Sequence, residues 1–358
     1  MSPSRRTTRN RAGKIPGRKC VLASLLVLVI AVGGAIPAAA FADLYPREQL
    51  MKSAKRLQIA VRNIYERGIL PSLTAEETTR LGHVTFAFPL PRKNDDLLNF
   101  YAYRKNGRAV VTMPLLSLVA LEDLTTAYAW LYQNGYSLST IDLYFTMLRY
   151  RRRADFPGGR IGPPLEALSI PADALDDKRV DTLSLGLRNE AIAFIMIHEL
   201  GHLYYRHRGY GEITKARARR DETEADRFAF DILARTATPP LGAVLFFQAQ
   251  VYRFNHPGEF PTKAAWETYL AKRATHPLTV DRLRTMVRYM SGPLTKGRPG
   301  ERRTWLFAAA QLGKIVDTLE DRALMRCMAR VAERAPIDIL KPRRTTAKDA
   351  MATYCKGQ

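Results

Sequence analysis

The stretch "FIMIHELGHLYYRH", Phe194 to His207, places two histidines four residues apart, with a glutamate directly after the first. Positions four apart on a helix lie one turn above each other, so His198 and His202 are predicted to present their rings to a single ion, with Glu199 beside them. The flanking residues are mostly apolar, which predicts a buried helix. Buried histidines and a buried glutamate need polar partners, and a metal ion is the simplest one. The alternative is an amphipathic helix that carries two histidines without a metal.

A second segment supplies the missing ligand. The stretch "RRDETEADRFAFDILAR", which begins at Arg219, spaces Glu222 and Asp226 four residues apart. Zinc held by two imidazoles and one carboxylate keeps its fourth position open for water. We therefore expect Glu222 to be the third metal ligand and Asp226 to accept a hydrogen bond from His198. Glu224 is the competing ligand, although it points to a different face of the helix.

This ligand set predicts one Zn²⁺ ion per chain and hydrolytic chemistry. Zinc lowers the pKa of a bound water to about 7, and Glu199 is placed to take the proton as general base and pass it to the leaving amine. Gly201 lies inside the same helix, where glycine costs about 1 kcal/mol relative to alanine. We expect another backbone, or the substrate, to pass close to it.

The N-terminus resembles an export signal. Its first nineteen residues carry seven Lys or Arg and no acid, and the apolar run "CVLASLLVLVIAVGGAIPAAAFA" follows from Cys20 to Ala42. The small residues at its end favour a cleaved secretory leader. A membrane anchor formed by residues 20–42 is the alternative, because the run has 23 residues and a bilayer needs about 20. Either reading places the rest of the chain outside the cytoplasm, in the periplasm or another extracytoplasmic space.

The chain is strongly basic, with a net charge of +22 that falls to +15 without the seven charges of the leader. This excess favours contact with anionic membrane surfaces of the envelope. Nucleic acid is not an expected partner, since the basic residues are scattered and not interleaved with aromatic residues on one element. The other expected partners are protein or peptide substrates in the cell envelope.

Three cysteines are present, and two remain if the leader is removed. An oxidising compartment permits a disulfide between Cys327 and Cys355, but two reduced thiols fit the sequence as well.

The patterning predicts an α+β fold that is mainly helical, with a small antiparallel sheet and C-terminal helices. The spaced zinc-ligand motifs imply a zincin-like metallopeptidase core. A hairpin is expected around Lys105-Asn106-Gly107, and an edge strand from Arg108 to Met113 is expected to align an extended substrate. The Pro- and Gly-rich stretch from Asp155 to Asp177 is predicted to be a loop that connects elements at the surface, and a lid near a site is the alternative. The expected parts are residues 1–42 (leader or anchor), 43–178 (helices and hairpin), 179–290 (metallopeptidase core) and 291–358 (C-terminal helices).

Three segments resemble the HtpX and CAAX-prenyl-protease type family of zinc peptidases, which work in or beside membranes. "HELGHLYYRH" is similar to the family's catalytic helix and "ETEADRFAFDIL" to its Glu-x-x-Ala-Asp helix, with Glu222 at the ligand position and Asp226 at the orienting one. "ATHPLTVDRL", from Ala274, resembles its Thr-His-Pro segment followed by an arginine. The resemblance spans about Asn189 to Arg288.

The resemblance implies that His276 and Arg282 approach the active site. His276 would act as a transient fourth ligand or help to hold the oxyanion together with Arg282. The alternative is that His276 simply starts the next helix. The chain departs from the family in its short interval between the second histidine and Glu222, which is also similar to the ImmA and IrrE type peptidases, and in lacking multiple membrane spans.

These observations predict an exported zinc endopeptidase that cleaves cell-envelope proteins. The competing hypothesis is a metal-stabilised binding or chaperone protein that holds envelope proteins without hydrolysis. The two differ in their need for Glu199, because a binding protein requires the ligands but not the base.

Overall fold

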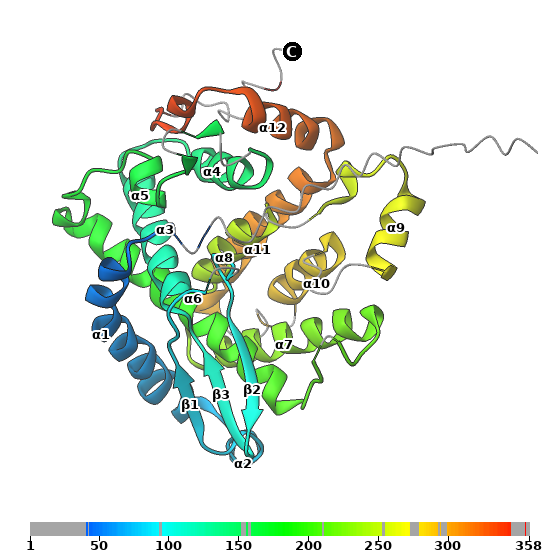
Figure 1. The fold of residues 1–358 in the computed structure, drawn as a ribbon. Helices are drawn as coiled ribbons and strands as arrows, with labels where there is room; N and C mark the ends of the chain where they lie inside the picture. Colours follow the sequence, from blue (N-terminus) through cyan, green and yellow to red (C-terminus); the bar gives the residue numbers. More distant parts are fainter. Residues whose placement is uncertain are drawn as a thin grey trace, which may run out of the picture. The chain divides into compact units, whose positions relative to one another are not determined.

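The computed structural model describes residues 41, 43–92, 95–151, 155–156, 159–209, 211–252, 255–272, 279–292, 294, 299–344 and 355. All of them belong to one compact unit, Ala35–Gln358. This unit is mainly helical and contains one three-stranded sheet, which confirms the predicted α+β class (Figure 1).

Among the described residues, three strands near the start form one short sheet and the other elements are helical. The strands are β1 (Val84–Ala87), β2 (Tyr101–Lys105) and β3 (Arg108–Thr112). The helices are α1 (Arg47–Asn63), α2 (Ala75–Leu81), α3 (Leu115–Gln133), α4 (Ser139–Tyr150), α5 (Pro164–Ala167), α6 (Lys178–Tyr204), α7 (Lys215–Arg235), α8 (Leu241–Val251), α9 (Lys263–Lys272), α10 (Val280–Ser291), α11 (Pro299–Glu320) and α12 (Arg322–Arg334).

Helix α6 is the element around which the core is built. It packs against α3, α7 and α8, and its run from Ala191 to Gly201 is buried on every side. This burial agrees with the apolar residues that flank the histidines. The helix begins where the Asp177 side chain accepts a hydrogen bond from the Arg179 backbone N–H at 2.8 Å, the usual way to satisfy an N-terminal donor. A 27-residue helix therefore carries the HExxH residues in its last turns.

The sheet has the order β1-β3-β2 and is mixed, not wholly antiparallel. The expected hairpin is present: β2 and β3 pair antiparallel around Asn106 and Gly107, whose φ angles of 51° and 79° suit a tight hairpin turn. Strand β1, however, pairs parallel with β3, with Val84 opposite Ala109. The antiparallel prediction was wrong for this strand. A hairpin is indicated by neighbouring residues, whereas β1 reaches its partner β3 through a longer connection that the pattern of apolar residues does not reveal.

The expectation that residues 108–113 form the sheet edge was also wrong. Strand β3 lies in the centre of the sheet, bonded on one side to β1 and on the other to β2. Strand β2 is the edge strand beside α6, because it packs against that helix. A substrate strand that adds to this sheet beside α6 would therefore pair with β2.

The C-terminal helices are joined to the rest of the described chain by several contacts. Helix α11 packs on α8 and α10, and α12 packs on α4. Cys327 of α12 forms a disulfide with Cys355, which resolves the choice between a bridge and two thiols for this structure. These contacts do not test the expected division at residues 178 and 290.

The described residues between Asp155 and Asp177 are irregular apart from α5 and one short helical turn at Ala174–Asp176. Phe156, Ile161 and Leu168 are buried, and the segment packs beside α3 through α5. These described residues therefore form a loop that packs against the core.

The expected leader falls outside the described residues, apart from Phe41. Phe41 is buried with Leu44 and Tyr45, and the Tyr45 hydroxyl donates a hydrogen bond to Asp123 of α3 at 2.8 Å. Within the described ranges, no helix has both the length and the apolar character needed to cross a bilayer.

Gly201 permits a close contact between α6 and α7, as its position in the helix predicted. A Cβ atom at Gly201 would lie 3.0 Å from the Ala225 Cα and 3.3 Å from the Phe228 Cβ. Atoms at these distances repel one another, so a larger residue would push the two helices apart. The observed spacing between α6 and α7 therefore requires a glycine at position 201.

We expect Gly201→Ala to destabilise the protein by about 1–3 kcal/mol, because overpacking outweighs the gain in helix propensity. Gly186→Ala on the same helix is the matched control, since a Cβ there meets nothing within 4 Å and should stabilise by up to about 1 kcal/mol. Urea unfolding of both variants in the presence of a chelator measures the difference. Equal stabilities would contradict the close contact.

Candidate metal centre

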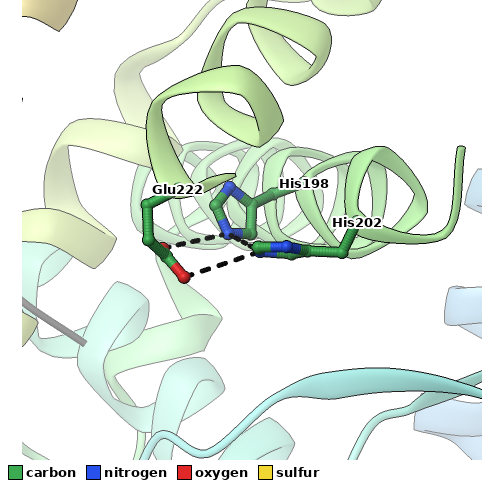
Figure 2. Close-up of side chains that lie close together, drawn as sticks. All are labelled: His198, His202 and Glu222. Atoms are coloured by element: carbon green, nitrogen blue, oxygen red, sulfur yellow. Dashed lines mark hydrogen bonds and ion pairs between the residues drawn. The ribbon is translucent and has the colours of Figure 1, made fainter. Parts of the chain in front are cut away.

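His198, His202 and Glu222 point toward one another from two neighbouring helices, α6 and α7 (Figure 2). The Nε2 atoms of the two histidines are 3.1 Å apart. The Glu222 carboxylate oxygens lie 3.5 Å from His198 Nε2 and 3.6 Å from His202 Nε2. A tetrahedral zinc ion with bonds of about 2.0–2.2 Å separates its ligand atoms by about 3.3–3.6 Å. Both Glu222 distances fall in this range, and the Nε2–Nε2 distance of 3.1 Å is slightly shorter, so the three residues fit a zinc ion after a small ring movement. Their role as ligands stays a prediction.

These side chains open into a pocket of about 460 Å³. Glu199 lines the same pocket, as the general base must if it is to reach a water beside the ion. The rest of its lining comes from β2 and the residues before it, from α6 and the residues that follow it, including His207, from Asp221 of α7, from α8, and from Arg282 of α10. None of the described residues between Asp155 and Asp177 lines this pocket.

Asp226 lies behind His198, where the spacing predicted it. The His198 Nδ1 atom is 3.0 Å from Asp226 Oδ1, and Asp226 is 1% exposed. With Nε2 turned toward Glu222, Nδ1 faces this carboxylate in an ion-pair contact, so a proton on Nδ1 points toward Asp226. Asp226 therefore fixes the ring orientation of His198.

Arg282 approaches the site, but its guanidinium contacts the two carboxylates. Its Nε and Nη2 atoms donate to the two Asp226 oxygens, each at 2.7 Å, and its Nη1 lies 2.6 Å from Glu222 Oε2. A fork of this kind binds a carboxylate in one orientation. The geometry assigns Arg282 a contact with both residues, whereas the resemblance implied an oxyanion contact.

The buried charges shift the pKa values of the two histidines in opposite directions. Burial alone lowers the pKa of His198, but Asp226 and Glu222 outweigh it and raise the pKa to about 10. Burial lowers the pKa of His202 to about 3, with Glu222 opposing the shift. Burial raises the pKa of Asp226, yet Arg282 and His198 keep it below its ordinary value. The site thus favours a positive charge between His198 and the carboxylates, which a metal ion also supplies.

Side-chain caps determine where α7 and α10, the other two helices of the site, begin. The Thr214 side chain accepts from the Arg217 backbone N–H at 3.2 Å and starts α7 two turns before Glu222. The Thr279 side chain accepts from the Arg282 backbone N–H at 3.1 Å and starts α10. Arg282 therefore projects from a first helical turn, which is a rigid support.

Glu224, the competing ligand, does not face the two metal histidines. Its side chain is 40% exposed, and its Oε2 lies 3.0 Å from Nε2 of His207. The side chain of His207 is 3% exposed, and its Nδ1 lies 2.9 Å from Nδ1 of His202. The contact of His207 with His202, a predicted metal ligand, was missed because His207 lies beyond the end of α6, where helical spacing gives no guidance.

His276 lies outside the described residues, so its approach to the site stays a prediction.

We expect wild-type protein to retain about one zinc ion per chain after dialysis, and Glu222→Gln to lose it. Loss of a neighbouring carboxylate that only supports a ligand costs 10–100-fold in affinity, so loss of a direct ligand should cost at least about 100-fold. Metal content measured by mass spectrometry tests this. Glu224→Gln is the matched control and should keep its ion at saturating zinc. Loss of zinc from Glu224→Gln alone would transfer the ligand role to Glu224.

Comparison with known proteins identifies one family over the segment that holds this site. The family model of Peptidase U49 matches residues 166–300. The match covers under half of the chain, but it includes α6, α7 and α10 with all the described residues of the candidate centre. No curated protein and no solved structure matches the chain.

The match corrects the resemblance to the HtpX and CAAX-prenyl-protease type family, because Peptidase U49 is a different peptidase family. Short motifs misled the assignment for a physical reason. Two histidines that bind one zinc ion from the same helix lie four residues apart, and the glutamate that completes the set comes from a second helix. Unrelated peptidases that hold zinc in this way therefore share the spacing. The match indicates that this segment of the chain is similar to a peptidase.

Proposed function

We propose that the protein is an exported zinc-dependent endopeptidase of glutamate-zincin type that hydrolyses peptide bonds of cell-envelope proteins. One observation carries the metal-dependent part of the proposal: two imidazole nitrogens and one carboxylate converge at tetrahedral ligand distances beside Glu199 in a pocket of about 460 Å³. The match to a peptidase family over the same segment supports hydrolysis of peptide bonds.

The residues of the site have separate tasks in this proposal. His198, His202 and Glu222 hold the ion, and Asp226 and Arg282 orient two of these ligands. Bound zinc supplies a Lewis acid that polarises the substrate carbonyl and makes a water more acidic.

Glu199 accepts the proton of the attacking water and delivers it to the nitrogen of the departing amine. This task requires a carboxylate in the pocket close to the ligands, and Glu199 is adjacent to His198 in sequence and lines that pocket. General base catalysis of this kind contributes about 10²–10⁴-fold to the rate.

An extended substrate is proposed to add to the edge of β2. Tyr101 and Ala102 of this strand line the pocket, and β3 already occupies the other side of β2. Backbone hydrogen bonds with an added strand position a peptide without regard to its sequence. Strand β2 thereby replaces β3 in the role that we expected from the sequence.

Two features support the exported location. The basic and apolar N-terminus is typical of an export signal, with removal of the leader or anchoring by residues 20–42 as the two routes. The disulfide between Cys327 and Cys355 is the second feature, because disulfides persist in oxidising compartments and are rare in the cytosol. The basic surface would favour contact with anionic membrane surfaces.

We expect Glu199→Gln to abolish zinc-dependent cleavage of an unfolded protein such as casein, with a loss of about 10²–10⁴-fold, while zinc content stays unchanged. Asp181→Asn, an exposed change on the same helix, is the control and should leave cleavage intact. Unchanged cleavage by Glu199→Gln would refute its role as base. If wild type cleaves nothing, and wild type and Glu199→Gln bind unfolded envelope proteins equally, the binding-protein hypothesis is favoured.

We expect the full chain to be recovered from the periplasmic or membrane fraction with Cys327 and Cys355 protected from alkylation. A version starting at Phe41 is the control, since Phe41 is buried in the core and should be kept. That version should remain in the cytoplasm with reactive thiols. Recovery of the full chain from the cytoplasm with free thiols would contradict export.

A further inference from the structure

A second group of polar side chains lies directly behind His202. It consists of His207, Asp221 and Glu224, none of which belongs to the proposed ligand set. His207 and Asp221 have side chains only 3% exposed. His207 Nδ1 is 2.9 Å from His202 Nδ1, and His207 Nε2 is 3.0 Å from Glu224 Oε2 and 3.6 Å from Asp221 Oδ1. The His207 ring therefore bridges a predicted metal ligand and two carboxylates.

The end of α6 brings His207 back to this position. The backbone N–H of His207 donates to the His202 carbonyl at 3.0 Å, and that of Arg206 donates to the Leu203 carbonyl at 3.3 Å. Arg206 has a φ of 55°, so the pair of bonds forms a Schellman-type helix end with a left-handed residue at its centre. The Tyr205 ring stacks on the His207 ring with 5.5 Å between centroids. Backbone and aromatic contacts thus fix His207 beside the preceding turn.

The order of protons along this chain of contacts follows from the metal site. His202 directs Nε2 toward His198 and Glu222, so Nδ1 must carry its proton. That proton is donated to Nδ1 of His207, which then carries its own proton on Nε2. The Nε2–H of His207 donates to Glu224. Each donor meets an acceptor, and only one tautomer of each histidine satisfies the whole chain.

We propose that His207 is a positioning residue that orients His202 for metal binding through the contact between their Nδ1 atoms, with Glu224 holding His207 in the required tautomer. The inference rests on the metal site of the proposed function. It gives the two metal histidines equivalent support, since Asp226 backs His198 directly and His207 backs His202. Partners behind ligating histidines fix the ring and strengthen the ligand, and losing one costs 10–100-fold in metal affinity.

A second metal ion held by His207, Asp221 and Glu224 is the rival explanation, because their ligand atoms also lie within 4.8 Å of one another. The contacts of Arg217 argue against it. Its Nε lies 2.6 Å from Asp221 Oδ1, and its Nη2 lies 3.7 Å from Glu224 Oε2. A guanidinium already supplies positive charge to both carboxylates, and the third member is already bonded to His202. The geometry favours a supporting chain over a second ion.

Three substitutions of His207 separate a specific acceptor from general packing. Asparagine places its carbonyl oxygen near the position of Nδ1, so His207→Asn keeps an acceptor for His202. Glutamine places its amide near Nε2, so His207→Gln keeps the contact with Glu224 and loses the one with His202. His207→Leu removes both. His256→Leu is the control for burial, since His256 is a 1% exposed histidine that is absent from the pocket.

Zinc affinity is measured by competition with a chromophoric chelator, and stability by urea unfolding of the metal-free variants. We expect the dissociation constant for zinc to rise about 10–100-fold in His207→Leu and His207→Gln and to stay close to wild type in His207→Asn. His256→Leu should lose stability and keep its zinc affinity. The zinc content at saturation should remain one ion per chain in every variant.

The proposal is overturned if affinity follows stability across all four variants, or if His207→Asn binds as weakly as His207→Leu. Two zinc ions in wild type and one in His207→Leu would overturn it in favour of a second metal site. The assay contains no substrate, so a protein that binds zinc but cleaves nothing refutes the peptidase proposal and leaves this one standing. A wild type that binds no zinc refutes both.

Discussion

Two buried carboxylates on one face of α7 need positive charge, and the packing around them meets this need. Glu222 is 4% exposed and Asp226 is 1% exposed. Leaving such groups buried without a partner costs several kcal/mol, so the surrounding elements must bring cations or donors to them. Arg282 contacts both carboxylates from α10, and His198 contacts both from α6. The mutual position of these three helices therefore depends on the same charges that form the candidate centre.

The approach of α6 to α7 is the steric counterpart of this charge arrangement. Gly201 lets the backbone of α7 pass close at Ala225, between Glu222 and Asp226 in sequence. If a side chain at Gly201 pushed α6 and α7 apart, Glu222 would move away from the histidine rings, because its short side chain could not span the added distance. The predicted ligands therefore converge because the two helices pack closely. The close helix spacing and the convergence of the predicted ligands both depend on Gly201, so a larger residue there is expected to disturb both.

The sheet and the helix ends illustrate what local patterns predict and what they miss. The hairpin at Asn106-Gly107 was predicted because its turn residues adopt positive φ angles by themselves. The parallel partner of β1 was not predictable, because it depends on residues far apart in the chain. The same holds for His207, whose contact with His202 arises from a left-handed residue after the last turn of α6. Short zinc-ligand spacings also failed to identify the family, since the coordination geometry imposes them on unrelated peptidases.

The sequence by itself determined the mainly helical class, the burial of the HExxH helix, and the pairing of residues four apart within each helix. These features follow from a backbone period that nearby residues fix through local hydrogen bonds. The tertiary structure alone decided that Glu222, and not Glu224, faces His198 and His202, and that Arg282 contacts both carboxylates of α7. It alone placed His207 behind His202 and β2 at the sheet edge beside α6. Which side chains meet across separate elements depends on packing and on the neutralisation of buried charge, and neither can be read from the spacing of residues along one helix.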